Sequence, residues 1–354
     1  MKIFFALLLS FSLALFEAPS HAATINGQNY VPLADWAGAN GLKIFWLKRG
    51  DEIAASNRTA RLVFDKDSST AEINGVNVRL SFPVAVDKGA PLIAQFDLDK
   101  TIRPLLYPAR YLEPKRITTI WLDPGHGGKD TGNRVGGFFS HNEKTYTLLL
   151  ALELRDQLQR AGFRVLLTRS RDTFVELPAR PALANKAGAD LFVSLHFNAA
   201  QTDKDTVAGP ETYCITPVGA NSSNASVEGS EYGMAGGAGP TVANRCELKS
   251  LIFAYQIQKS LVQNLGVNDR SVRRARFAVL RDAQMPAILI EGGYMTNPAE
   301  SKRIYDPVWR RQMAAAVVKG ILNYQRLTAP PAIYHPPSTN PPPVNPSAVH
   351  NNNN

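Results

Sequence analysis

The chain has 354 residues, of which 44% are hydrophobic and 19% are charged, and its formal net charge is +9. This composition excludes a wholly disordered protein, and the length suffices for one large domain or two ordinary ones. Residues 23–114 carry 11 Lys/Arg against 10 Asp/Glu, whereas residues 115–327 carry 27 against 19. The basic excess of the second segment is compatible with nucleic acid, an anionic lipid, an anionic polymer, or a merely soluble surface.

The first 22 residues have the pattern of a secretory signal peptide. Lys2 supplies a positive charge, residues 3–16 are mostly apolar, and Ser20 and Ala22 provide small residues around a cleavage point. That stretch, like every other apolar run, is shorter than the roughly 20 residues of a membrane span. We therefore expect an exported protein without a membrane span. A periplasm is the favoured location, and the cell wall or the outside of the cell is the alternative. Export argues against a nucleic-acid partner.

Residues 23–114 predict a small β-rich accessory domain. Apolar and polar residues alternate at 60–64 and 76–80, and the pairs Asn26-Gly27 and Asn74-Gly75 are hairpin signals. Residues 35–42 predict one short helix that ends at a glycine. This domain either tethers the protein to a wall or a partner, or supports folding.

Part of this segment also resembles a known protein module. Its two Ile-Asn-Gly stretches and Tyr30-Val31-Pro32-Leu33 resemble the copper-amine-oxidase N-terminal-like module of exported bacterial proteins. The resemblance does not imply copper.

From residue 117 the pattern changes to strands that alternate with helices, which predicts a mainly parallel sheet with helices on both faces. We expect strands at 117–122, 163–168, 191–195, 211–215 and 287–290, and helices at 143–161, 177–187, 248–265 and 307–327. Residues 115–327 would form the catalytic domain, and residues 328–354 a Pro/Asn-rich disordered tail.

The polar, Gly-rich stretch 216–245 interrupts the α/β pattern and predicts a long loop. Cys214 and Cys246 lie at its two ends. An oxidising compartment would permit a disulfide between them, but the sequence leaves open whether the two thiols are within reach.

Four chemically capable residues lie at strand ends or helix starts. His126 follows the strand at 117–122, Glu143 begins a helix, His196 follows 191–195, and Glu291 follows 287–290. Carboxyl ends of parallel strands meet at one edge of a sheet, so these side chains could converge. Two imidazoles and a carboxylate form a catalytic zinc set with a fourth position for water, and a further carboxylate would move protons.

Each of these residues also has a structural interpretation. The helix dipole favours Glu143 at a first turn, a lone histidine is often only hydrogen-bonded, and Glu291 could be a buried, paired acid. His141 is a rival ligand by spacing alone. Separations of 17, 53 and 95 residues match no short-range metal motif.

At these residues the sequence resembles the zinc-dependent N-acetylmuramoyl-L-alanine amidases of the amidase-3 type. Seven blocks carry the resemblance in order, between about residues 117 and 324: residues 122–128 (LDPGHGG), 142–144 (NEK), 167–169 (LTR), Arg180 with 184–185 (AN), 194–199 (SLHFNA), 209–213 (GPETY) and 289–297 (LIEGGYMTN).

The resemblance implies that His126, Glu143 and His196 bind one zinc ion and that Glu291 is the catalytic acid/base. It favours Glu143 over His141, because the Asn-Glu-Lys block aligns that glutamate with the family ligand. The implied reaction is hydrolysis, by zinc-activated water, of the amide between N-acetylmuramic acid and L-alanine of the peptidoglycan stem peptide. Such activity serves cell-wall remodelling or daughter-cell separation.

The chain departs from the family pattern at Phe197, where a small residue is more usual, and at Ser271, where a glycine commonly follows Asp-Arg. Some relatives carry an autoinhibitory helix whose glutamate caps the zinc. The Gly-rich stretch disfavours a long helix here, although Glu228 or Glu231 could still plug the site.

Basic residues precede the strand that carries Glu291, and Asn198 lies in a family block. We expect the arginines to bind the carboxylates of stem peptides, because arginine pairs with carboxylates through two parallel hydrogen bonds, and we expect Asn198 to bind substrate as well. The set comprises Asn198, Arg270, Arg273, Arg274, Arg276 and Arg281. The basic charge then indicates an anionic wall polymer, and the sequence identifies no activator protein.

Two competing functions remain. A zinc peptidase of related fold would cleave a peptide bond without needing the sugar. A catalytically silent wall-binding module would keep the fold without turnover, although the presence of all four expected residues argues against it.

Overall fold

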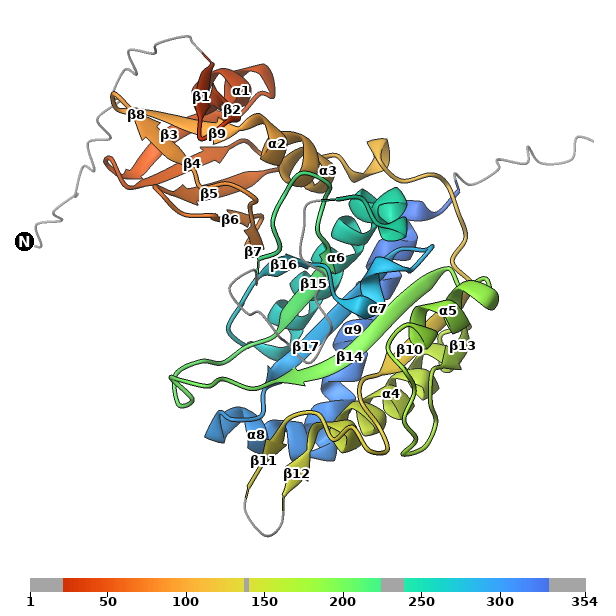
Figure 1. The fold of residues 1–354 in the computed structure, drawn as a ribbon. Coiled ribbons are helices and arrows are strands. Elements are labelled where there is room, and N and C mark those ends of the chain that lie inside the picture. The colour runs from red at the N-terminus through yellow and green to blue at the C-terminus, as the bar shows by residue number, and fades with distance from the viewer. Residues whose placement is uncertain (1–21, 137–139, 224–238, 331–354) are drawn as a thin grey trace, which may run out of the picture.

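The computed structural model describes residues 22–136, 140–223 and 239–330 (Figure 1). Residues 1–21 of the predicted signal peptide, the tail beyond residue 330, Glu228 and Glu231 lie outside these ranges, so the predictions made for them stay untested. Among the described helices, none combines the length and the apolarity that crossing a membrane requires.

The largest sheet of the described chain has eleven strands. Its order is β13 (Arg164–Leu167), β10 (Thr119–Pro124), β14 (Leu191–Asn198), β17 (Ala287–Tyr294), β15 (Glu211–Ile215), β16 (Val272–Ala275), β7 (Val76–Arg79), β6 (Thr70–Ile73), β5 (Arg61–Asp65), β4 (Glu52–Ser56) and β3 (Lys43–Lys48). The strands predicted from residue 117 onward all lie in it.

The eleven-stranded sheet as a whole is mixed, so the prediction of a mainly parallel sheet is not confirmed for it, although β15 with β17 is the only antiparallel pair among its described strands from residue 117 onward. Strands β13, β10, β14 and β17 are mutually parallel, and so are β15, β16 and β7. Strand β15 runs against β17, and β3 to β7 form an antiparallel meander. Within the meander, tight turns such as Asn74-Gly75 give antiparallel neighbours, whereas helical crossovers such as α4 between β10 and β13 give parallel ones.

The meander of the N-terminal segment joins the sheet of the second segment directly, which was not expected. Val78 of β7 pairs with Val272 of β16, and Figure 1 shows these two strands side by side. The backbone N–H of Asn77 donates to Asp269 Oδ2 at 2.7 Å, and Tyr255 donates to the carbonyl of Ile73 at 2.9 Å. The domain boundary near residue 114 stays a prediction, but the hydrogen-bonded sheet continues across it.

The remaining N-terminal residues form a small antiparallel sheet and short helices. The sheet contains β1 (Ala23–Ile25), β2 (Gln28–Pro32), β9 (Ala90–Ala94) and β8 (Ala85–Asp87). Helix α1 (Leu33–Ala39) follows β2, and α2 (Gln95–Asp97), η1 (Leu98–Ile102), α3 (Arg103–Leu106) and η2 (Pro108–Arg110) lead toward β10.

Helices predicted from the periodicity are present near the expected limits. They are α4 (Glu143–Arg160), α5 (Ala179–Lys186), α6 (Glu247–Leu265) and α9 (Pro307–Thr328). The structure adds a hairpin of β11 (Arg134–Val135) and β12 (His141–Asn142), together with η3 (Val242–Cys246), α7 (Ala278–Arg281) and α8 (Pro298–Tyr305). The short pieces were missed because they hold too few residues to show a period.

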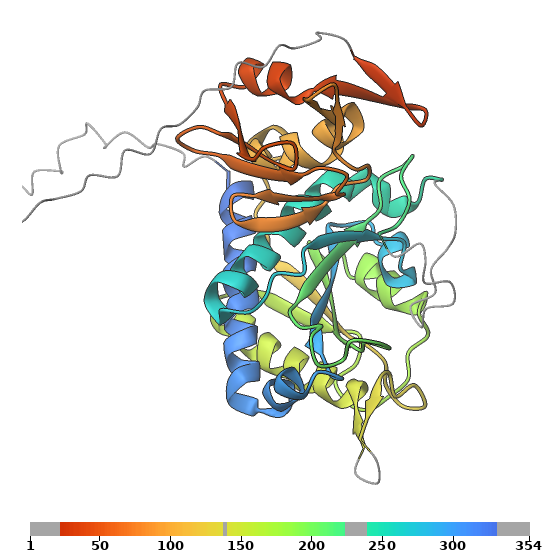
Figure 2. The ribbon, with the colours of Figure 1, turned by 90° about the vertical axis from the view of Figure 1, so that its left-hand side faces the viewer.

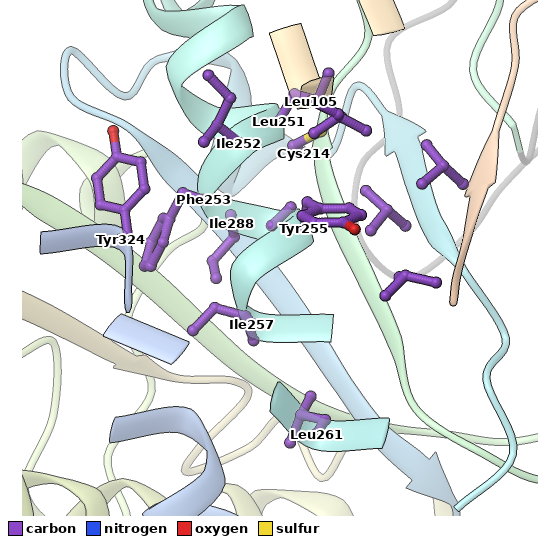
Figure 3. Close-up of a cluster of buried hydrophobic side chains, with 14 of the residues drawn as sticks. Leu105, Cys214, Leu251, Ile252, Phe253, Tyr255, Ile257, Leu261, Ile288 and Tyr324 are labelled. Carbon is purple, nitrogen blue, oxygen red and sulfur yellow. The ribbon is translucent and has the colours of Figure 1, made fainter. Parts of the chain in front are cut away.

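The core lies on both faces of the sheet. Helix α9 packs against α4 and α6 on one face of the sheet. In Figure 2, α9 is the long blue helix at the left-hand side of the molecule. On the other face, α5 and α7 cover a smaller cluster. Figure 3 shows how α6 seals the larger cluster with Leu251, Ile252, Phe253, Tyr255, Ile257 and Leu261, beside Leu105, Cys214, Ile288 and Tyr324. Both cysteine thiols are free, so the structure contains no Cys214–Cys246 disulfide.

Candidate metal centre and active site

The four residues named from the strand ends lie at one edge of the sheet. His126 follows β10, His196 lies near the end of β14, Glu291 lies in β17, and Glu143 begins α4. His196 and Glu291 are register partners across the parallel pair β14 and β17, so their side chains share one face of the sheet. The topology therefore brings residues that are far apart in sequence to one place.

His126, Glu143 and His196 form a group that could hold a metal ion. Their ligand atoms all lie within 4.8 Å of one another, and all three side chains are buried. Glu143 Oε2 lies 3.1 Å from His126 Nε2, and Glu143 Oε1 lies 3.1 Å from His196 Nδ1. Two nitrogen donors and one carboxylate match a catalytic zinc set.

Glycines make room for this group. A Cβ atom on Gly125 would lie 2.2 Å from the His196 ring, and one on Gly132 would lie 2.7 Å from Glu143 Oε2. Such distances exclude a larger residue unless the ligands move. The residues present thus fit a small ion bound by three side chains.

The loop after β10 adopts an unusual backbone conformation that aims His126 inward. His126 itself has φ 61°, in the left-handed region, and Gly127 and Gly128 have φ 126° and 57°. Non-glycine residues in this region cost about 1–2 kcal/mol and concentrate at functional sites. Gly127 and Gly128 therefore permit the sharp turn at His126, because glycine adopts positive φ without steric cost.

Two buried arginines hold this loop. Arg169 donates to the carbonyls of Pro124 at 3.0 Å and Gly125 at 2.7 Å. Arg180 donates to the carbonyl of His126 at 3.0 Å and forms an ion pair with Asp123 at 2.9 Å. Their place in the family blocks thus has a local structural reason.

Asp130 and Asn133 support the ligands, and sequence reasoning missed both. Asp130 accepts from Nδ1 of His126 at 2.9 Å. Asn133 donates to Glu143 Oε2 through both its backbone N–H and its side-chain amide, each at 2.9 Å. The only sequence signal was a carboxylate four residues after a candidate ligand, within the same Gly-rich loop.

The charges of the group are tightly linked. Burial lowers the pKa of His126, but Glu143 and Asp130 outweigh burial and raise that pKa to about 10. Burial lowers the pKa of His196, and its contact with Glu143 only partly offsets this effect. Burial raises the pKa of Glu143, but the two imidazoles hold it well below its usual range. Metal binding would displace the proton from His126, because ligands bind in their deprotonated form.

His141, the rival ligand, lies in an aromatic cluster instead. Its ring stacks on Tyr305 with centroids 3.9 Å apart, and Nδ1 contacts the hydroxyl of Tyr146. The compact His-Glu-His group of the described chain contains Glu143 and not His141.

The basic residues expected at the crevice divide into two classes. Arg274 and Arg276 are each only 3% exposed, and their guanidinium groups donate to backbone carbonyls such as Lys100 at 2.8 Å and Ala220 at 3.1 Å. This burial favours a structural role for both residues, and their assignment to substrate binding stays an untested prediction. Arg281 is half-buried in α7.

Arg270 and Arg273 differ from these residues because both are partly exposed and both pair with the buried Glu211. Asn198 also contacts Glu211, through its side-chain amide at 3.4 Å. Glu211 itself pairs in register with Glu291 across β15 and β17. In the sequence, Glu211 is distinguished only by its place in the 209–213 block.

The two departures from the family pattern have different surroundings. Phe197 is fully buried in the larger core cluster. Ser271 has φ 87°, a conformation that favours the glycine found in the family.

Comparisons with known proteins give the same indication as the site. Residues 120–323, more than half of the chain, match the family described as N-acetylmuramoyl-L-alanine amidase. The amidase AmiC of Neisseria meningitidis serogroup B is 32% identical over 302 residues, which cover 75% of this chain and 72% of that protein. LytC of Bacillus subtilis is 33% identical over 208 residues, but they cover only 36% of it and 59% of this chain.

A solved structure of similar sequence is AmiC2 of Nostoc punctiforme, which is 31% identical, with 59% of this chain and 97% of that chain covered and a TM-score of 0.47. The match to the family and the identity to AmiC together show that this chain belongs to the N-acetylmuramoyl-L-alanine amidase family.

Proposed function

We propose that this amidase cleaves the bond between the lactyl group of N-acetylmuramic acid and L-alanine, with one zinc ion held by His126, Glu143 and His196. Glu291 is the acid/base in this proposal. The observation that carries it is the convergence of three buried ligand side chains, from β10, α4 and β14, within 4.8 Å of one another.

The donor set favours zinc over harder cations. Imidazole nitrogens suit zinc, whereas calcium and magnesium prefer oxygen ligands only. When bound here, zinc would supply Lewis acidity, which polarises an amide carbonyl and makes water a stronger acid.

Glu291 transfers the proton during the hydrolysis. Its carboxylate accepts a proton from the attacking water and then donates it to the departing nitrogen of L-alanine, so that a neutral amine leaves. Its position supports this role, because it is buried and lies beside His196 in the sheet. Glu143 and Asp130 meanwhile fix the orientation of the two imidazoles.

The compartment is part of the proposal. Residues 1–22 would direct export, which places the enzyme where peptidoglycan is found, and the excess of basic over acidic residues from 115 to 327 suits an anionic wall polymer. The N-terminal sequence of the protein recovered from outside the cytoplasm tests this step, since an intact Met1 would contradict it.

Digestion of purified sacculi tests the reaction. The amidase should release intact stem peptides with a free L-alanine amine and leave unsubstituted muramic acid, as mass spectrometry of the products would show. Release of single amino acids with intact sugar–peptide links would favour a zinc peptidase instead.

The matched control is Glu291→Gln, which preserves shape but cannot cycle a proton. It should retain zinc and sacculus binding while losing cleavage. If the wild type cleaved no better than this variant, a silent wall-binding module would be the better description. Loss of zinc in His126→Ala and in His196→Ala, measured by elemental analysis, tests the ligands, and full occupancy in both would refute them.

A further inference from the structure

A row of side chains crosses the sheet at the proposed active site. His196 of β14 pairs in register with Glu291 of β17, and Glu291 pairs with Glu211 of β15. Register partners in adjacent strands point to the same face, so Glu211 is the next side chain beyond the proposed acid/base. Neither the metal group nor the proton transfer uses this second carboxylate.

Glu211 is buried and receives hydrogen bonds from several elements. Tyr213 donates to its Oε2 at 2.6 Å, and Tyr294 donates to its Oε1 at 2.9 Å. Arg270 donates to Oε1 through Nε at 2.9 Å, and Arg273 Nη2 lies 3.4 Å from the same oxygen. A buried carboxylate with this many donors is held in one orientation, so it can in turn orient the residues that it binds.

The side chain of Arg270 is held in place by Glu211 and Tyr294. Glu211 takes the Nε atom, and the guanidinium lies over the ring of Tyr294, 5.1 Å from the ring centroid. The side chain of Arg270 nevertheless stays 31% exposed. A guanidinium has five N–H donors in a rigid plane, so fixing its Nε edge orients the rest of the fork.

The other arginines of this segment lack that combination. Arg274 and Arg276 are buried on backbone carbonyls, as described above. Arg273 is less exposed than Arg270, at 22%, and is farther from Glu211. Arg270 is therefore the candidate anion receptor, bound to Glu211, the register partner of Glu291.

We infer that Glu211 is a positioning residue that fixes Arg270 to bind a carboxylate of the stem peptide, close to the scissile amide. This inference rests on the proposed function and adds to it the chemical group that is recognised. The receptor selects a free carboxylate over a carboxamide, because a planar cation pairs with the former through charge-assisted hydrogen bonds.

The test compares two soluble muramyl peptides that differ only at the residue after L-alanine, which carries either a free carboxylate or a carboxamide. The wild type should show a KM roughly 10-fold or more lower for the carboxylate substrate. Arg270→Gln should raise that KM by about the same factor, with a much smaller effect on kcat. Arg270→Lys, which keeps the charge but loses the fork, should give an intermediate value.

Glu211→Gln tests the positioning role. It should weaken the preference for the carboxylate in the otherwise wild-type enzyme and add little in an Arg270→Gln background, since both changes remove one interaction. Arg155→Gln is the matched control, because Arg155 also pairs with an acid and is 32% exposed, but lies about 18 Å along α4 from Glu143. It should leave both KM values unchanged.

Two outcomes would overturn the inference: Arg270→Gln that still prefers the carboxylate, or an effect of Glu211→Gln that persists in full in the Arg270→Gln background. Thermal melting shows whether Glu211→Gln folds. If it does not fold, the KM values of Arg270→Gln and Arg270→Lys decide whether Arg270 binds the carboxylate. A wild type that cleaves neither substrate, nor sacculi, would instead contradict the proposed function.

Discussion

Asp130 holds Nδ1 of His126 at 2.9 Å, and this contact turns Nε2 of the same ring toward Glu143. Such a carboxylate–histidine pair fixes both the tautomer and the direction of a metal ligand. Asp130→Ala should lower the affinity for zinc by about 10- to 100-fold, as measured by competition with a chelator. Asp156→Ala, at an exposed site on α4, is the control. Unchanged affinity in Asp130→Ala would show that the pair has no such role.

Gly125 faces the ring of His196. In Gly125→Ala the new Cβ would lie 2.2 Å from that ring, so the ligand has to move. We expect loss of zinc and activity, with a free energy of unfolding lower by about 1–3 kcal/mol from overpacking. Gly38→Ala is the matched control, since nothing lies within 4 Å of its added Cβ. Normal zinc content in Gly125→Ala would contradict the proposed tight fit.

Ser271 combines a left-handed backbone with a buried hydroxyl. Its φ is 87°, and its Oγ has no hydrogen-bond partner among the described residues. Ser271→Gly should raise the free energy of unfolding by about 1 kcal/mol, because relief of both costs exceeds the added entropy of the unfolded chain. Chemical denaturation measures the change. A lower stability would mean that the serine is not strained.

Asp190 connects the starts of β14 and β10. It accepts from the backbone N–H groups of Thr118 at 2.8 Å and Thr119 at 2.9 Å, and it pairs with Lys115 at 2.7 Å. Burial raises the pKa of Asp190, but Lys115 and the backbone donors outweigh burial and lower it to about 2.

A depressed pKa of this kind stabilises the fold above the unfolded value, near 4, and the stabilisation is lost as the pH falls toward 2. It amounts to about 2 kcal/mol. In Asp190→Asn the free energy of unfolding should therefore be lower at pH 7 and should vary less between pH 4 and 2. Denaturation at several pH values checks this, with Asp156→Asn as the exposed control. An unchanged slope would exclude Asp190 as its source.

The N-terminal segment contributes to the stability of the amidase segment. A chain that begins at Lys115 loses β7, the neighbour of β16, and the apolar partners that residues 33–112 supply to the shared core cluster. We expect such a chain to be insoluble, or to unfold at a markedly lower temperature than the full chain. Separate, independently reversible transitions for the two segments would contradict this expectation.

The sequence predicted the positions of the site better than its surroundings. His126, His196 and Glu291 could be placed because short apolar runs show where strands end, and the carboxyl ends of parallel strands share an edge. Val78 and Val272, by contrast, pair over a distance of nearly 200 residues, and no local pattern specifies the partner of a strand.

The charge count could not predict which basic residues are exposed. It located the basic segment, but Arg274 and Arg270 look alike in sequence although one binds a backbone carbonyl in the interior and the other lies partly exposed beside Glu211. Burial is decided by packing between distant elements, which composition does not report. For the same reason Glu211, Asp130 and Asn133 became visible as supporting residues only in three dimensions.

The pairing of β7 with β16 also limits how this protein can be recombined. An accessory segment joined only by a linker can be exchanged for another without regard to the partner. Here a replacement for residues 23–114 would have to present a strand parallel to β16, with a small apolar residue opposite Val272 and a donor for Asp269. Engineered fusions to this amidase are therefore better made outside the continuous sheet than at the apparent boundary near residue 114.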